Sequence, residues 1–73
     1  MDEKALLKTV AEILEVDEVS LDTDLEDLGW DSLSNLSFIA EVDDAAGLTI
    51  DADQLTEAKT VADLKALVDA ARA

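Results

Sequence analysis

Residues 31–47 read Asp-Ser-Leu-Ser-Asn-Leu-Ser-Phe-Ile-Ala-Glu-Val-Asp-Asp-Ala-Ala-Gly, and they carry the clearest structural signal in the chain. Asp31 is a residue type strongly preferred as a helix N-cap. Gly47 stands where a glycine commonly ends a helix in the left-handed conformation. The stretch therefore predicts a helix from Ser32 to about Ala46.

The apolar side chains of this predicted helix separate into two groups when placed at helical spacing. The first group is expected to face a core and contains Phe38, Ile39, Val42, Ala45 and Ala46. The second group lies on the opposite side and contains Leu33, Leu36 and Ala40, flanked by Asp43 and Asp44. A small bundle cannot cover both faces. The second face is therefore interpreted as an exposed apolar strip with a negative rim. It either binds a partner or consists of leucines that are simply exposed to solvent.

The segments on either side predict further helices. Apolar residues at helical spacing indicate a helix from about Asp2 to Glu15. Thr60 followed by Asp63 resembles a capping box that opens a last helix. The run between Gly47 and Lys59 has room for one short helix, and the aperiodic residues 16–31 form a long loop anchored by scattered apolar residues. We expect an all-α fold with three main helices, one short helix and a long first loop, and residues 1–73 as a single domain.

Composition excludes several classes of function. The chain has 19 acidic and 5 basic residues and a net charge of −14, which argues against binding nucleic acid or an anionic membrane. No Lys or Arg occurs from residue 9 to residue 58, so basic proteins or cations are the expected partners. Since 49% of residues are hydrophobic, the chain should nevertheless fold.

The absence of Cys and His removes the usual thiol nucleophile, general base and metal ligands, so we expect neither an enzyme nor a metal site. Neither a signal peptide nor a membrane span is found, and the expected location is the cytoplasm. Met1 favours a free-standing protein over a module cut from a longer synthase.

Ser32 is the candidate functional residue. A serine beside Asp31 at a helix start is usually explained by capping. The chain has no His base and no Gly-x-Ser-x-Gly motif, so a serine hydrolase is excluded. The positive end of a helix does, however, favour an anion, and a hydroxyl there is well placed to carry a phosphate.

Residues 27–33 read Asp-Leu-Gly-Trp-Asp-Ser-Leu and resemble the attachment motif of acyl carrier proteins, in which the central Ser of Asp-Ser-Leu carries 4′-phosphopantetheine. The resemblance extends over essentially the whole chain, including the acidity, the size and Thr60-Val61 at the last helix. It implies a four-helix carrier-protein bundle, modification of Ser32 by a phosphopantetheinyl transferase using coenzyme A, and acyl-loading and acyl-processing partners with basic docking patches. The carrier is expected to be a monomer.

The same resemblance assigns roles to individual residues. Asp31 and Leu33 flank Ser32 and would be recognised by the transferase. Further partner recognition is implied for Leu36, Ala40, Glu41, Asp43 and Asp44. An acyl chain would be hidden, as in some carriers, among Phe38, Ile39, Val42, Ala46, Ile50 and Ala58. The small alanines leave two expectations open, a modest space for a chain or a tightly closed core.

Four positions depart from the pattern of carriers that serve fatty-acid synthesis. Ser34 and Ser37 stand where those carriers usually have acids, Trp30 replaces a small or aliphatic residue, and Asp51 replaces Pro. These departures favour a carrier for a specialised pathway, such as polyketide synthesis, lipid modification or aminoacyl transfer, and fatty-acid synthesis stays open as the alternative.

Two other classes of function are alternatives to a carrier protein. An EF-hand loop starting at Asp22 would require Gly at its sixth position and Glu at its twelfth, where Asp27 and Leu33 stand, so specific calcium binding is not expected. The remaining alternative is an acidic helical interaction domain in which Ser32 is only a helix cap.

Overall fold

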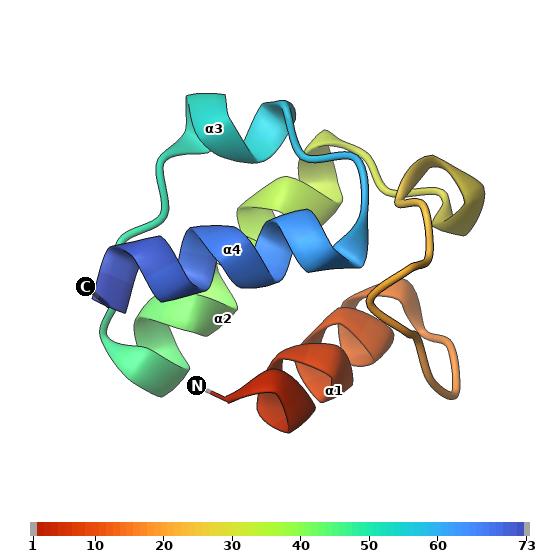
Figure 1. The fold of residues 1–73 in the computed structure, drawn as a ribbon, viewed down its shortest axis with the longest axis horizontal. Coiled ribbons are helices and arrows are strands. Elements are labelled where there is room, and N and C mark those ends of the chain that lie inside the picture. The colour runs from red at the N-terminus through yellow and green to blue at the C-terminus, as the bar shows by residue number, and fades with distance from the viewer. Residues whose placement is uncertain (1, 73) are drawn as a thin grey trace.

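The computed structural model describes residues 2–72. In chain order it contains α1 (Glu3–Leu14), η1 (Glu26–Leu28), α2 (Ser32–Ala46), α3 (Ala52–Thr56) and α4 (Val61–Arg72) (Figure 1). The all-α class is confirmed, with three main helices and one short one. None of the helices within residues 2–72 combines the length and apolar character needed to cross a lipid bilayer.

The helix ends follow from local side-chain chemistry. The Asp2 carboxylate accepts a hydrogen bond of 2.8 Å from the Ala5 N–H at the start of α1. The Asp51 carboxylate accepts two backbone N–H groups at the start of α3. At the end of α2, Gly47 has φ +66° and its N–H donates to the Asp43 carbonyl at 2.9 Å. Glycine reaches this left-handed conformation without steric cost, so α2 ends where predicted.

The predicted capping box at the start of α4 is confirmed. The Asp63 carboxylate accepts the backbone N–H groups of Lys59 at 2.8 Å and Thr60 at 3.2 Å. In return, the Asp63 N–H donates to the Thr60 hydroxyl oxygen at 3.3 Å. Because these N–H groups favour the charged carboxylate, chiefly that of Lys59, the pKa of Asp63 lies below its ordinary value.

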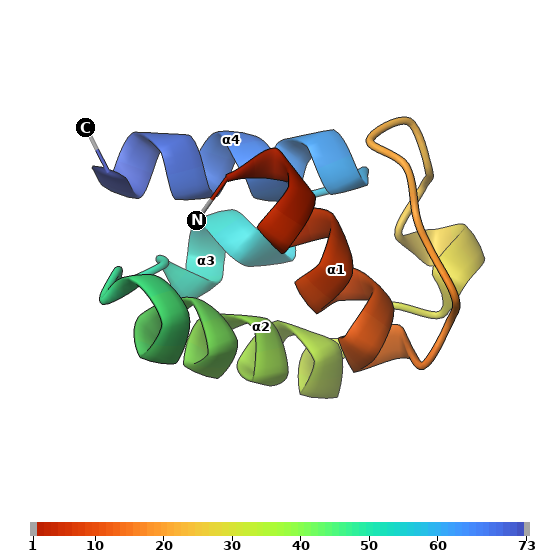
Figure 2. The same ribbon diagram turned by 90° about the horizontal axis from the view of Figure 1, so that it is seen from below.

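The α-helices enclose one hydrophobic core. In Figure 2, α2 and α4 run along opposite sides of the molecule with α1 and α3 between them, and α1 and α3 each pack against both. The buried residues that form the core are Leu6, Val10, Leu25, Phe38, Val42, Ile50, Leu55, Val61, Leu64 and Val68. The core therefore takes side chains from every α-helix and from the long loop.

The loop of residues 15–31 is held against the start of α4. The Leu25 N–H donates to the Lys59 carbonyl at 2.8 Å, and the Val61 N–H donates to the Thr23 carbonyl at 3.1 Å. The Leu25 side chain is only 2% exposed, which confirms that apolar residues anchor this loop. The single turn of 3-10 helix, η1, was not predicted because three residues are too few to show a periodic pattern.

The described ion pairs lie within α4. Asp69 accepts a bond of 2.8 Å from the Lys65 ammonium and one of 3.3 Å from the Arg72 guanidinium. The hydrogen bond from Lys65 is the main reason that the pKa of Asp69 lies below its ordinary value. No ion pair is found for an acid of residues 9–58 within the described chain, so this stretch keeps its negative field unneutralised.

Candidate functional site

The start of α2 is shaped by the Asp31 cap. The Asp31 backbone is extended, and its carboxylate accepts the Ser34 backbone N–H at 3.0 Å and the Ser34 hydroxyl at 3.2 Å. Ser34 is 9% exposed and is the one polar residue in the buried set of the described chain. Asp31 and Ser34 therefore satisfy each other and fix the first turn of the helix.

The Ser32 hydroxyl on this turn is exposed and makes no hydrogen bond within residues 2–72. The backbone N–H groups of Ser32 and Leu33 also have no acceptor there, as expected in the first turn of a helix. These N–H groups and the helix dipole make the surroundings of the hydroxyl favourable for an anion. Ser32 thus combines an unbonded hydroxyl with nearby N–H groups that would stabilise a phosphate.

The other serines lack this combination. Ser34 is buried and bonded to Asp31, and the Ser20 hydroxyl lies 2.9 Å from the Thr23 hydroxyl in the loop. Ser37 is exposed, but it lies beyond the first turn of α2, where backbone N–H groups are bonded within the helix. Position, more than residue type, distinguishes Ser32.

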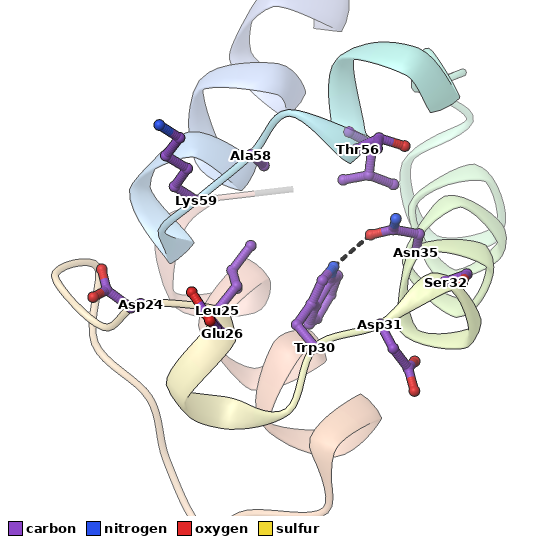
Figure 3. Close-up of a pocket in the computed structure, with 11 residues that line it drawn as sticks. Asp24, Leu25, Glu26, Trp30, Asp31, Ser32, Asn35, Thr56, Ala58 and Lys59 are labelled. Atoms are coloured by element: carbon purple, nitrogen blue, oxygen red, sulfur yellow. Dashed lines mark hydrogen bonds between the residues drawn. The ribbon is translucent and has the colours of Figure 1, made fainter.

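A pocket of about 650 Å³ opens beside Ser32. Figure 3 shows α2 and the segment before it on one side of the pocket and the α3–α4 connection facing them. The lining residues are Trp30, Asp31, Ser32 and Asn35 on the first side, Leu55, Thr56, Ala58 and Lys59 on the second, and Asp24, Leu25 and Glu26 from the loop. The pocket therefore joins two regions that are distant in the sequence, residues 24–35 and residues 55–59.

Trp30 and Asn35 in this pocket were not singled out together from the sequence. The Trp30 indole Nε1–H donates to the Asn35 side-chain oxygen, as Figure 3 shows. A signal for this pair was present, because at helical spacing Asn35 falls among the core-facing residues of α2, where a polar side chain requires a partner.

The residues considered for an acyl cavity do not share one location. Phe38, Val42 and Ile50 lie in the closed core, with exposures of 0%, 0% and 4%. Ile39 and Ala46 are partly buried on α2. Of the six, Ala58 is the one that lines the pocket beside Ser32.

The two faces predicted for α2 are largely confirmed in their exposure. Leu33 and Leu36 are 73% and 64% exposed, and Ala40 is exposed beside them. The acidic residues expected along this strip, Glu41, Asp43 and Asp44, are also exposed. The placement of Ala45 on the core face was wrong: it is exposed, because no neighbouring element covers that side of the last turn.

The acidic side chains are the groups of this chain that could bind a metal ion. Within residues 2–72, no group of three or more acidic side chains is arranged so that it could hold a metal ion. The loop acids considered for an EF-hand are therefore not gathered into a site.

An exposed, unbonded hydroxyl at a helix N-terminus, beside a pocket in a small acidic bundle, is the arrangement expected of a prosthetic-group carrier. The chain matches the family model of the phosphopantetheine attachment site over residues 4–68 and belongs to this family. This confirms the carrier-protein membership that the Asp-Ser-Leu motif predicted. A comparison with curated proteins gives no match.

Domains of this family carry a 4′-phosphopantetheine prosthetic group and are typically non-catalytic. They interact with phosphopantetheinyl transferases and biosynthetic enzymes. The chemistry at the start of α2 fits that group, because Ser32 offers a free hydroxyl for a phosphodiester and the helix offers two unpaired N–H groups.

Proposed function

We propose that this chain is an acyl carrier protein and that Ser32 is its attachment residue. The observation that carries the proposal is the exposed, unbonded Ser32 hydroxyl at the N-terminus of α2, in a chain of the phosphopantetheine attachment family. Attachment breaks the Ser32 O–H bond and forms an Oγ–phosphorus bond. The bond between that phosphorus and the bridging oxygen of the coenzyme A pyrophosphate breaks, adenosine 3′,5′-bisphosphate leaves, and the transferase accepts the proton.

The chain contributes position and charge in this scheme. Asp31 binds Ser34 and leaves the hydroxyl of Ser32 unbonded and accessible to the transferase. The free N–H groups at the helix start stabilise the negative phosphodiester. When attached, the prosthetic group supplies the thiol that the chain lacks and holds acyl groups as thioesters. The chain itself needs no catalytic residue, and we propose that it is not an enzyme.

The exposed strip of α2 is proposed as the docking surface for the partner enzymes. It consists of Leu33, Leu36 and Ala40 with the acids Glu41, Asp43 and Asp44. Exposed leucines provide apolar contact, and the uncompensated acids attract a basic patch and speed its approach. Asp31 and Leu33 lie closest to Ser32 along the chain and are proposed to contact the transferase.

We further propose that the carrier serves a specialised pathway, such as polyketide synthesis or another acyl transfer outside routine fatty-acid synthesis. Ser34 supports this proposal, since it is buried against the Asp31 carboxylate, where an acidic side chain would bring two negative charges together. Ser37 leaves a second position of α2 uncharged. A partner that relies on acids at these positions would therefore find none.

Modification by a phosphopantetheinyl transferase tests the attachment residue. The unmodified protein is incubated with coenzyme A and a broad-specificity transferase, and its intact mass is measured. One phosphopantetheine should be added to the wild type and none to Ser32→Ala. Ser37→Ala is the matched control, because it removes an exposed serine hydroxyl from the same helix and should be modified normally.

Modification that persists in Ser32→Ala would refute the assignment, as would a wild-type protein that gains no mass. The intact mass of protein isolated from its native cell then separates an acyl cargo from an aminoacyl one. Size-exclusion chromatography and cell fractionation test two further proposals, that residues 1–73 act as a monomeric carrier domain and that the protein is cytoplasmic.

A further inference from the structure

Three contacts hold Trp30 in place, one through its backbone and two through its ring. Its backbone N–H donates to the Leu25 carbonyl at 3.0 Å, and its indole N–H donates to the Asn35 side-chain oxygen. The ring meets Phe38 edge to face, with centroids 6.0 Å apart and planes at 69°. Edge-to-face packing of this kind is a favoured arrangement of aromatic pairs. Trp30 is therefore part of the packed structure although it lies just outside α2.

The ring also lies between two environments. In front of it is the pocket that Ser32 lines. On its other side the ring contacts Phe38, which is completely closed to solvent. Leu25 and Leu55 line the pocket and are nevertheless 2% and 1% exposed, so little of their surface is open toward it. A cargo that moved from the pocket toward the core beside Phe38 would therefore have to pass the indole ring.

The pocket in front of the ring is poorly suited to a long apolar chain. Most of its lining residues are polar, namely Asp24, Glu26, Asp31, Ser32, Asn35, Thr56 and Lys59, and its apolar members Leu25 and Leu55 expose little surface. An alkyl chain in this open pocket would displace water from polar groups without replacing their hydrogen bonds. A short or polar acyl group could remain here, partly solvated, without that cost.

Entry into the core would require the ring to move. Movement would break the bond between the indole N–H and the Asn35 oxygen and would separate the ring from Phe38. A polar group that loses its partner in a part-buried place is costly. The Trp30–Asn35 hydrogen bond and the Trp30–Phe38 contact thus both oppose movement of the ring away from the core.

We propose that Trp30 is a specificity-determining residue that closes the core to the cargo on Ser32. The carrier then holds short or polar acyl groups in the outer pocket and does not sequester long alkyl chains. This inference rests on the proposed function, since it requires a cargo attached through Ser32.

A chain-length series tests the inference. The transferase is supplied with acetyl, butyryl, hexanoyl, octanoyl and decanoyl coenzyme A, and intact mass confirms each loaded form. In the wild type, the melting temperature and the emission maximum of Trp30, the single tryptophan, should stay constant from butyryl to decanoyl. A steady rise in melting temperature with a shift in emission would overturn the inference.

Trp30→Leu is the opening variant, because leucine keeps apolar packing on the core but is smaller than the indole. Its melting temperature should rise with chain length, by at least about 4 °C for each added pair of buried methylene groups. Leu67→Ala is the control, since it loosens the core from α4 at a residue that does not line the pocket. It should show no dependence on chain length.

Asn35→Leu provides a second route that keeps the ring and removes its acceptor. Its melting temperature should also rise with acyl chain length, but less than that of Trp30→Leu. Indifference of both opening variants to chain length would overturn the inference, as would equal dependence in the Leu67→Ala control. Failure of the wild type to load at Ser32 would instead refute the proposed function, and this inference with it.

Discussion

The two faces of α2 carry similar apolar side chains in opposite environments. Phe38 and Val42 are completely buried, whereas Leu33 and Leu36 on the other face are largely exposed. The buried face stabilises the fold, and the exposed face adds no comparable burial. An exposed leucine strip bordered by unpaired acids is therefore better explained by binding than by stability. Substitutions that separate stability from docking test this comparison.

Truncation of the buried face should have the largest effect. Phe38→Ala removes a ring that is fully buried and contacts Trp30, and should reduce the free energy of unfolding by about 3–5 kcal/mol. Leu36→Ala on the exposed face should change it by no more than about 0.5 kcal/mol. Urea denaturation measures both. Equal losses would contradict the division of α2 into two faces.

A charge on the exposed strip should affect docking more than folding. Leu36→Asp is expected to weaken binding to a partner enzyme by roughly tenfold or more, because it places a charge in an apolar contact. Its melting temperature should stay close to that of the wild type, since the side chain is exposed. Surface plasmon resonance with the transferase measures the first quantity and calorimetry the second. Normal docking by this variant would remove the strip from the binding surface.

Removal of the N-cap acid of α2 and of an exposed acid within α2 should affect stability differently. Asp31→Ala removes the helix cap and the acceptor of the buried Ser34 hydroxyl, and should cost about 1 kcal/mol of stability. Asp44→Ala removes the same charge from an exposed position with no described hydrogen bond, and should leave stability unchanged or slightly raised. Thermal unfolding compares them. If both variants lose equal stability, the cap is not what Asp31 contributes.

Salt should shift folding and docking in opposite directions. With a net charge of −14 and no described ion pair within residues 9–58, self-repulsion works against the folded state, so added NaCl should raise the melting temperature by a few degrees, on the order of 2–5 °C. The same screening should weaken attraction between the acidic strip and a basic partner. Titration of both quantities with salt checks the signs, and a rise in affinity with salt would contradict electrostatic docking.

The smallest effect is expected from the acids of α4. The pKa values of Asp63 and Asp69 are lowered in the folded state, so each contributes stability above the ordinary carboxyl value of 3.8. That contribution is lost as pH falls through the lowered folded values. Melting temperatures between about pH 5 and about pH 2 measure the loss. Asp63→Asn should reduce this loss, and an unchanged pH profile would show that the cap makes no charge-dependent contribution.

Local rules predicted the parts of the fold that depend on neighbouring residues. Asp31 and Gly47 correctly marked the start and end of α2, and Thr60 with Asp63 correctly marked α4. Ala45 escaped these rules, since burial near the end of a helix depends on whether another element reaches that far. The burial of Ser34 was missed for a similar reason: a cap partner can be enclosed by elements that its own helix pattern does not describe.

The candidate site was predictable in part. The motif and the helix start identified Ser32, and helical spacing identified the exposed strip of Leu33 and Leu36. The cavity residues were a weaker prediction, because spacing places Phe38 and Val42 on an interior face without showing whether that interior has space. The pairing of Trp30 with Asn35 became evident only from the structure, where the two side chains form a hydrogen bond.

The helical class, the caps, the acidic field and the position of Ser32 were all predictable from the amino-acid sequence, because each depends on residue type and on spacing within one segment. The tertiary structure alone decided that the long loop joins the start of α4, that a pocket opens beside Ser32 and that Trp30 lies between this pocket and the core. These features depend on contacts such as that of Leu25 with Lys59, between segments far apart in the chain. Local propensity and periodicity carry no information on such contacts, which are set by how the whole core packs.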